Sequence, residues 1–425
     1  MREDDLIHFC PPARLIIGAG ARAQLPSLVA HLGYRRGVLV TDIFFATRTP
    51  WVREYVEAAE AAGVSTLVFD GGQRDPTTAL CDSATREVRE VLGGATPDHV
   101  IALGGGSNID LAKALCLTLQ SGKPVREFVG VLPSVRRPLP LIALPTTAGT
   151  GSEATPGAIL VDPLNSTKVA VMDNALRPQL ALIDPEFTYT CPPNVTADAG
   201  IDALTHAIES YLTIDSSEYD RGGHADPGYS GRSSLTMMFA REAITLCARY
   251  LKRCYDNGGD TEARAGMCHA SIYAALSYGS AGLNAVHGIA YAVAGLTHRS
   301  HGTTNAVMLP YVLGALAETR RDDLVQVARM FDISERDEDE AIQTLCHMLR
   351  DMIASLGIPT DLRALGVEHA SLSGLTRNAL NVTRLAKAFP VADVARAYAD
   401  IVQRAYCGEL GKTPLQIGDT ALDFN

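Results

Sequence analysis

Two residues with metal-binding side chains, Asp202 and His206, stand four positions apart in the segment GIDALTHAIE. The apolar residues around them have helical spacing, and positions i and i+4 share one face of a helix. A carboxylate and an imidazole on one helix face lie within reach of a single ion. Because a buried carboxylate needs a partner, the pair indicates either a bound metal or a satisfied contact in the core.

Two further histidines, His287 and His301, each precede a glycine and are fourteen residues apart. This distance allows a helix and a turn back, so both could complete a site with Asp202 and His206. Three imidazoles and one carboxylate suit Fe²⁺ or Zn²⁺. Such an ion polarises a carbonyl or lowers the pKa of a bound alcohol. Spacing alone also fits four core or surface residues that bind nothing.

Two glycine-rich segments, each after a predicted strand, compete for the role of phosphate loop. Residues 18–23 (GAGARA) match the pattern G-x-G-x-x-A. Residues 104–107 (GGGS) precede a predicted helix, whose amides and dipole favour an anion. A second Thr/Gly-rich strand end follows at residues 145–152, and two such ends of parallel strands form a nucleotide-binding crevice. We therefore predict the pyrophosphate site at residues 104–107.

Asp42 ends the predicted buried strand GVLVTD, at residues 37–42. A carboxylate at this position can accept hydrogen bonds from ribose hydroxyls, and it would repel a 2′-phosphate. The sequence therefore favours NAD over NADP.

The first part of the chain alternates strand and helix patterns, which predicts an α/β fold with a parallel sheet and helices on both faces. From about Cys191 the strand patterns fade and long Ala- and Leu-rich helical patterns dominate. We predict an α/β dinucleotide-binding domain over residues 1–190 and an all-helical metal-binding domain over residues 191–425. A polar, Gly-rich segment at 215–234 is long for a helix connection, and its role is left open.

Composition excludes several classes of protein. The net charge of −11 disfavours nucleic acid as a partner. The nine cysteines form no C-x-x-C pair, which favours free thiols in a reducing cytoplasm. The N-terminus lacks the pattern of a signal peptide, and the apolar run at residues 278–296 fits a buried helix better than a membrane span. Abundant apolar helices favour a homo-oligomer, a dimer or larger.

Several motifs in order resemble the iron-containing (group III) alcohol dehydrogenases, over residues 12 to 410. The motifs are GGGSNIDLAK at 104–113, PTTAGTGSEAT at 145–155, GIDALTHAIESY at 200–211, VHG at 286–288 and HGTTNAVMLPY at 301–311. The resemblance implies an N-terminal nucleotide-binding domain of the dehydroquinate synthase-like architecture, an all-helical C-terminal domain and an active site in the cleft between them.

The resemblance also implies roles for individual residues. The implied metal ligands are Asp202, His206, His287 and His301. The implied cofactor contacts are Asp42, Gly105, Gly106, Ser107, Asp110, Thr146, Thr147, Ser152 and Lys168.

One position departs from the pattern of many family members, which read His-Gly-x-x-His after the third ligand. Here Tyr291 takes the second place, as in the branch that resembles the hydroxyacid-oxoacid transhydrogenases. Its hydroxyl could bind a carboxylate or relay a proton, and the ring could equally be a buried aromatic. Arg299 could pair with a substrate carboxylate, and as a loop residue it could simply be solvated.

The leading hypothesis is an NAD-dependent, metal-dependent dehydrogenase that acts on a small alcohol, aldehyde, hydroxy acid or oxo acid. The metal would be Fe²⁺, with Zn²⁺ as the alternative. A second hypothesis is a transhydrogenase that never releases its cofactor. A third is a lyase of the dehydroquinate synthase type, although the motifs offer few basic residues for a phosphorylated substrate.

Overall fold

The structure is a computed structural model that describes residues 6–131, 137–164 and 167–410. The chain divides into two compact units, residues 1–284 and 285–425. This division falls later than the change from strands to helices near residue 190, because three long helices belong to the first unit. The predicted domain boundary at 190 describes that change in secondary structure and stays a prediction.

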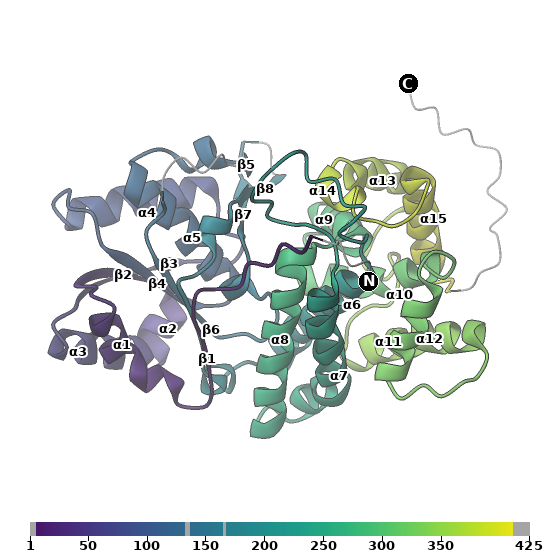
Figure 1. Cartoon of the computed structure of the whole chain (residues 1–425), viewed down its shortest axis with the longest axis horizontal. Coiled ribbons are helices and arrows are strands. Elements are labelled where there is room, and N and C mark those ends of the chain that lie inside the picture. Colours follow the sequence, from purple (N-terminus) through teal and green to yellow (C-terminus); the bar gives the residue numbers. More distant parts are fainter. Residues whose placement is uncertain (1–5, 132–136, 165–166, 411–425) are drawn as a thin grey trace. The chain divides into compact units, whose positions relative to one another are not determined.

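A six-stranded parallel sheet forms the core of the α/β part of the first unit (Figure 1). Its strand order is β1-β9-β6-β4-β2-β3. The central strands β4 and β6 are buried along their whole length, as expected for strands covered on both faces. The strands are β1 (Leu15–Ile17), β2 (Arg36–Asp42), β3 (Ser65–Gly72), β4 (His99–Gly104), β6 (Leu141–Pro145) and β9 (Leu180–Ile183).

Helices cover both faces of this sheet. Val38 and Val40 of β2 pack with α4 (Thr78–Val91) and α5 (Gly106–Ser121), whereas Leu39 packs with α1 (Leu25–His31) and α3 (Trp51–Ala61). Successive strand residues point to opposite faces, so one apolar run serves two cores. The predicted α/β class with a parallel sheet is confirmed.

A second, three-stranded sheet was not predicted from the sequence. Its order is β5-β8-β7, and β7 pairs with β8 in the antiparallel sense. These strands are β5 (Gly130–Val131), β7 (Gly157–Asp162) and β8 (Thr167–Met172). The short helices of this part of the chain are η1 (Ala21–Gln24), α2 (Ile43–Arg48), η2 (Val125–Phe128), η3 (Ser152–Ala154), η4 (Asn174–Leu176) and η5 (Pro185–Thr188).

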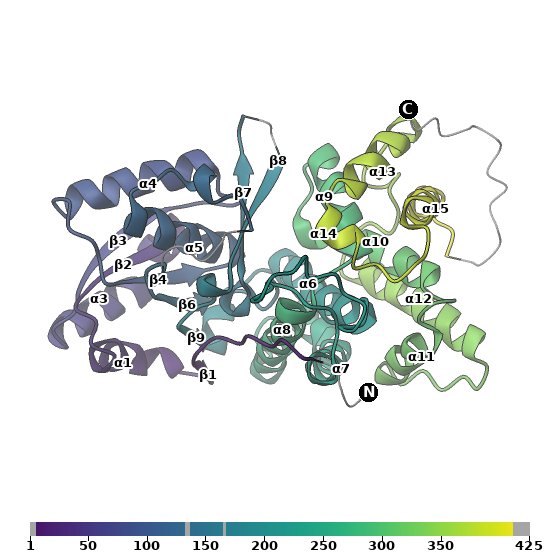
Figure 2. The ribbon, with the colours of Figure 1, turned by 45° about the horizontal axis from the view of Figure 1, so that its top comes forward.

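Three long helices complete the first unit, α6 (Pro193–Leu212), α7 (Ser234–Asp256) and α8 (Thr261–Ala281), and Figure 2 shows them side by side. The polar segment between α6 and α7 is closed at its base, where Arg232 Nε donates to Asp215 Oδ1 at 2.9 Å. Asn174 Nδ2 also donates to Asp226 Oδ1 at 2.6 Å. The segment is therefore closed at its base and attached at its middle to η4.

Among the described residues of the second unit, helices are the only regular secondary structure, and loops connect them. Its helices are α9 (Ala285–Thr297), α10 (His301–Ala315), α11 (Arg321–Met330), α12 (Glu338–Ser355), η6 (His369–Ser371), α13 (Leu372–Leu380), α14 (Thr383–Ala386) and α15 (Val394–Cys407). The apolar run at 278–296 is not one helix, because α8 ends at Ala281 and α9 begins at Ala285. Among the described helices, none is both long and apolar enough to cross a membrane.

Candidate functional site

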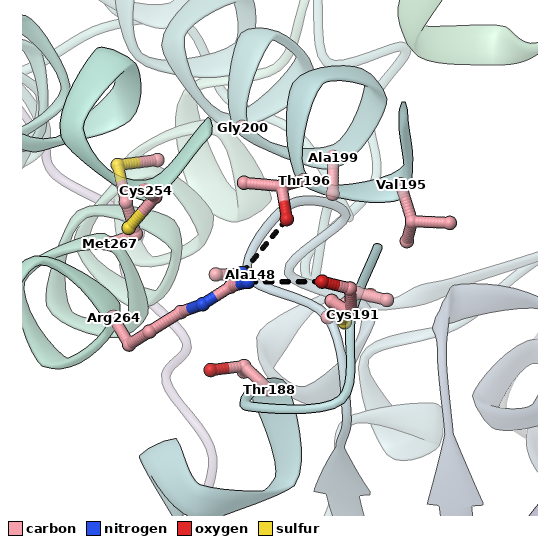
Figure 3. A pocket seen from close by; sticks show the side chains of 11 residues that line it. Ala148, Thr188, Cys191, Val195, Thr196, Ala199, Gly200, Cys254, Arg264 and Met267 are labelled. Carbon is pink, nitrogen blue, oxygen red and sulfur yellow. Dashed lines mark hydrogen bonds between the residues drawn. The ribbon is translucent and has the colours of Figure 1, made fainter. Parts of the chain in front are cut away.

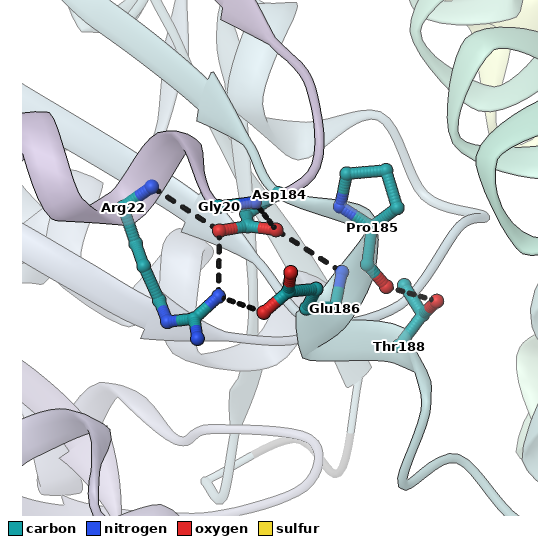
Figure 4. Close-up of polar contacts among 6 residues, drawn as sticks. All are labelled: Gly20, Arg22, Asp184, Pro185, Glu186 and Thr188. Carbon is teal, nitrogen blue, oxygen red and sulfur yellow. Dashed lines mark hydrogen bonds and ion pairs between the residues drawn. The ribbon is translucent and has the colours of Figure 1, made fainter. Parts of the chain in front are cut away.

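The turn after β1 has its amides engaged by a carboxylate of the protein itself (Figure 4). Oδ1 of Asp184 accepts from the Gly20 amide at 3.0 Å, and Oδ2 accepts from the Arg22 amide at 3.1 Å. The Arg22 guanidinium donates to Asp184 at 2.9 Å and to Glu186 at 2.5 Å. Asp184 has no exposed side-chain surface. This turn therefore fastens the edge strand β1 to the segment after β9.

The turn after β4 has a different environment. Gly105 is the N-cap of α5, and among the described residues no side chain caps this sixteen-residue helix. A Cβ on Gly106 would lie 2.7 Å from the side chain of Thr150, so the helix start packs closely against the 145–152 loop. A helix N-terminus without a side-chain cap presents amide donors and a positive dipole end. This geometry suits a phosphate group.

A buried lysine of α5, Lys113, connects the helix after the β4 turn to the end of the 145–152 loop and the residues that follow it. Lys113 Nζ donates to Thr155 O at 2.8 Å, to Gly157 O at 2.7 Å and to Ser152 Oγ at 3.3 Å. Ser152 Oγ also donates to Asp110 Oδ1. Burial lowers the pKa of Lys113 to about 8, and the charge of Asp110 opposes this change. Asp110 and Ser152, both expected to contact the cofactor, are thus tied to each other, and their contact with the cofactor stays a prediction.

A buried carboxyl group, that of Glu153, lies in η3 directly after the 145–152 loop and is 2% exposed. Its Oε2 has no hydrogen-bond partner among the residues that the structure describes. Burial raises the pKa of Glu153 to about 7. The loop therefore holds an acidic group that changes charge near neutral pH.

Asp42 lies where β2 meets α2, at the same end of the sheet as Gly104, which ends β4. Its Oδ1 accepts from the amides of Phe44 at 3.0 Å and Phe45 at 3.3 Å, so the carboxylate caps α2. Its Oδ2 accepts from Asn108 Nδ2 at 2.8 Å. A carboxylate and a helix start at neighbouring strand ends are the arrangement expected for a ribose and a pyrophosphate.

A small cavity of about 20 Å³ is lined in part by Thr147 and Ala148 of the 145–152 loop (Figure 3). Arg264 of α8 reaches into its lining and donates to Thr196 Oγ1 at 2.8 Å and to the Cys191 carbonyl at 3.0 Å. The volume corresponds to about one water molecule. The cavity is too small for a nicotinamide ring, so it does not receive the cofactor.

The first pair of candidate metal ligands lies within α6. Asp202 and His206 are both buried at 3% exposure, and Oδ1 of Asp202 is 3.8 Å from Nε2 of His206. The ring of Tyr278 stacks on His206 with the ring centroids 4.1 Å apart, and its hydroxyl donates to Thr150 O. Burial raises the pKa of Tyr278 well above its usual value, which keeps this donor protonated. Tyr278 thus connects His206 to the second loop.

The second pair lies within the second unit. His287 is in α9, and His301 begins α10. Nε2 of His287 lies 3.0 Å from the side-chain nitrogen of Asn305, and Nε2 of His301 lies 3.2 Å from the same atom. The two imidazole nitrogens therefore converge on one point. Tyr291 stacks on His301 with the ring centroids 5.4 Å apart, so it lies beside this pair, and its role in binding or proton transfer stays a prediction.

Two arginines differ in their relation to Tyr291. Arg299 is exposed in the turn between α9 and α10, and its expected pairing with a substrate carboxylate stays a prediction. The guanidinium of Arg384, in α14, lies 5.9 Å from the centroid of the Tyr291 ring. Nε of Arg384 is buried without a hydrogen-bond partner among the described residues. Lys168, which the resemblance implies as a cofactor contact, forms an ion pair of 3.0 Å with Asp75.

Asp202, His206, His287 and His301 form a possible metal-binding group. Three imidazoles and one carboxylate are the donors that Fe²⁺ and Zn²⁺ accept. Metal–nitrogen distances of roughly 2.0–2.1 Å place two ligands of one ion roughly 3–4 Å apart. The 3.8 Å between the Asp202 and His206 atoms fits this range. The residues present therefore suit a divalent ion.

Sequence reasoning missed Asn108, Lys113, Glu153, Tyr278 and Arg384. For Lys113 a signal was available, because it is a charged residue inside the otherwise apolar segment LAKALCL, at residues 111–117. Such a residue needs buried partners. The contacts of Asn108, Tyr278 and Arg384 depend on elements far away in the sequence, which spacing does not reveal.

The comparisons with known proteins agree with this arrangement. Residues 12–185 match the family model for iron-containing alcohol dehydrogenase, and residues 223–403 match that for the C-terminal part of the same family. An NAD-dependent methanol dehydrogenase of Bacillus methanolicus is 30% identical, covering 87% of this chain and 92% of its own. The mitochondrial hydroxyacid-oxoacid transhydrogenase of Bos taurus is 30% identical, covering 88% and 84%. The crystal structure of a 1,3-propanediol oxidoreductase superposes with a TM-score of 0.85 at 25% identity, covering 94% and 100%.

The chain therefore belongs to the iron-containing alcohol dehydrogenase family. It is an oxidoreductase of the metal-dependent alcohol dehydrogenase class, and the family expected from its motifs is confirmed. The lyase hypothesis of the dehydroquinate synthase type is not supported by these relatives.

Proposed function

We propose that this protein transfers a hydride between NAD(H) and a small alcohol, aldehyde, hydroxy acid or oxo acid. One divalent ion would be held by Asp202, His206, His287 and His301. The observation that carries the proposal is that the ligand atoms converge within each pair of residues. The carboxylate oxygen of Asp202 lies 3.8 Å from Nε2 of His206. The Nε2 atoms of His287 and His301 both lie close to the side-chain nitrogen of Asn305. Fe²⁺ is the proposed ion, with Zn²⁺ as the alternative.

The metal, when bound, supplies a Lewis acid that polarises the substrate oxygen. The chain's own residues would then orient the substrate and exclude water. Tyr291, which stacks on His301, would donate or receive the proton that accompanies the hydride. Tyr278, fixed by its hydrogen bond to Thr150 O, holds the ring of His206 in place.

The proposed cofactor site lies at the ends of β2, β4 and β6. The amides of Gly105, Gly106 and Ser107 would hold the pyrophosphate, and Asp42 would accept from the ribose hydroxyls. Since the Asp42 carboxylate would repel a 2′-phosphate, NAD is proposed over NADP. The remaining proposed contacts are Asp110, Thr146, Thr147, Ser152 and Lys168.

A second candidate function, hydroxyacid-oxoacid transhydrogenase, is favoured by the position of Arg384. The partly buried guanidinium of Arg384 lies beside Tyr291 and has no acidic partner among the described residues, so it suits a substrate carboxylate. Arg384→Met should raise the KM for an oxo acid about tenfold, without changing the KM for an uncharged aldehyde of equal length. Arg299→Met is the matched control, and an effect there instead would assign the carboxylate to Arg299.

The proposed function is tested by NADH oxidation with short aldehydes, semialdehydes and 2-oxo acids, before and after chelation. Loss of activity on chelation, with recovery on adding Fe²⁺ or Zn²⁺, is the expected result. Oxidation of a hydroxy acid coupled to an oxo acid, with retained cofactor and no free NADH, would select the transhydrogenase. Activity that is unaffected by chelation would contradict the metal-dependent function.

Two expectations from the sequence, a homo-oligomer and a cytoplasmic location, are likewise proposals. All nine cysteines are free thiols in the structure, in keeping with a reducing compartment. The mass of the protein in solution, measured by light scattering, would give the number of subunits. Fractionation of cells that express it would give its location.

A further inference from the structure

Asn108, in the first turn of α5, is a buried polar residue to which no role has yet been assigned. It is 3% exposed. Its Nδ2 donates to Asp42 Oδ2 at 2.8 Å and lies 3.3 Å from the carbonyl oxygen of Leu103. Asp42 ends β2, whereas Leu103 lies in β4. One amide group therefore connects the carboxylate of Asp42, proposed to bind the ribose, to the turn after β4, where we propose that the pyrophosphate binds.

The backbone leaves room for this amide at two glycines. A Cβ on Gly104 would lie 2.1 Å from Nδ2 of Asn108, and a Cβ on Gly72 would lie 2.4 Å from Oδ1. Gly104 also has a φ of +149°, which side chains rarely adopt. The position of the Asn108 side chain is thus fixed by packing as well as by hydrogen bonds.

The bond from Asn108 decides how the carboxylate of Asp42 is oriented. Oδ1 of Asp42 is already engaged by the amides of Phe44 and Phe45, so Oδ2 is the oxygen left for a ligand. A carboxylate oxygen accepts two hydrogen bonds, and Asn108 takes one of them. The remaining acceptor direction of Oδ2 is therefore set by Asn108.

We propose that Asn108 is a positioning residue that fixes Asp42 for the ribose 2′-hydroxyl and so sets the preference for NAD over NADP. The inference rests on the proposed function, in which Asp42 meets the ribose. Without the amide donor, the carboxylate can turn away from a 2′-phosphate. Binding of NADH should then weaken, while the penalty against NADPH should decrease.

The test is equilibrium binding of NADH and NADPH, followed by nicotinamide fluorescence, on the metal-depleted full-length protein. Asn108→Ala removes the donor, and Asn108→Leu removes it while keeping the volume. In both variants the Kd for NADH should rise about tenfold, and the preference for NADH over NADPH should fall by at least that factor. Equal changes for both dinucleotides, or a changed preference only in the Ala variant, would overturn the proposal.

Two further variants separate positioning from general stability. In an Asp42→Ala background, Asn108→Ala should leave the NADH/NADPH ratio unchanged, because the residue acts through Asp42. Thr118→Val, in the same helix, removes a buried hydroxyl that contacts Thr85 Oγ1 at 2.6 Å and should alter only thermal stability. A ratio that changes in the Asp42→Ala background would overturn the inference. If the unmodified protein binds neither dinucleotide, the proposed function itself fails.

Discussion

The two glycine-rich turns of the first unit look alike in sequence but differ in what their amides contact. Both follow a parallel strand, and the first fits the dinucleotide pattern G-x-G-x-x-A. In the first turn the amides of Gly20 and Arg22 are engaged by the buried Asp184. In the second, Gly105 is the N-cap of a sixteen-residue helix that no described side chain caps. A glycine pattern therefore predicts a phosphate site only where no protein group engages the amides.

The supports beneath the turns also differ. The first is held by a charge cluster in which Arg22 is 30% exposed. The second is held by Lys113, which has no exposed surface and donates to the 152–157 segment. A rigid support of this kind is what a binding loop requires. The first turn connects strands, whereas the second is prepared to bind an anion.

The largest effect on stability is expected at Asp184. Asp184→Asn removes the charge that faces Arg22 and disturbs the bonds to two amides, which should cost about 3 kcal/mol of unfolding free energy. Chemical denaturation measures the loss. Binding of NADH should stay within twofold, because the first turn is not the cofactor site. A large loss of NADH affinity in a folded Asp184→Asn protein would reverse the roles of the turns.

A matched pair of glycine substitutions comes next. Gly105 has a φ of −72°, and a Cβ there would meet nothing nearer than 3.5 Å, so Gly105→Ala should fold normally. Its methyl group would nevertheless keep a pyrophosphate from the backbone, and the Kd for NADH should rise about a hundredfold, roughly 2.7 kcal/mol.

The control variant, Gly20→Ala, should lose stability and keep its affinity for NADH, which is the opposite of the result expected for Gly105→Ala. Gly20 has a φ of +75°, so the variant should lose about 1 kcal/mol of stability and keep its NADH affinity. Binding and thermal unfolding measured on both variants check the pair. Weakened binding in the Gly20 variant alone would contradict the comparison.

The smallest effect is a pH dependence at Glu153, in η3, directly after the 145–152 loop. The pKa of Glu153 in the folded chain is about 7, above its usual 4.5, so the folded state binds more protons between these values. Its contribution to stability is present below pH 4.5 and is lost as the pH rises to 7. Glu153→Gln should therefore stabilise the protein by about 2 kcal/mol at pH 8 and have little effect near pH 4.5. Unfolding curves at both pH values test this, and an equal change at each would contradict it.

Much of the fold followed from local patterns, for physical reasons. The central strands are buried on both faces, so their apolar runs and the glycines after them stand out in the sequence. The short strands β7 and β8 also carry four-residue apolar runs, but their burial is mixed and they pair with each other as antiparallel strands, outside the six-stranded sheet. The apolar stretch at 278–296 was wrongly expected to be one helix, because composition did not reveal the break at Gly282, where φ is +92°.

The candidate site was predictable in its residue types but not in its contacts. The four-residue spacing of Asp202 and His206 was sufficient to place them on one helix face. The partner of Asp42, by contrast, is 66 positions away in the sequence, and the guanidinium that lies over the Tyr291 ring belongs to Arg384, in a different helix. Such pairs arise from tertiary packing, which no single-segment pattern encodes.

The central claim is that one ion is shared by Asp202, His206, His287 and His301. The most direct measurement is the metal content per chain after anaerobic loading with Fe²⁺ or Zn²⁺, for the unmodified protein and for the variants Asp202→Ala and His287→Ala. The account predicts one ion per chain, and less than a tenth of that in either folded variant. Full metal content in either folded variant would show that the ion is held elsewhere and would contradict the account.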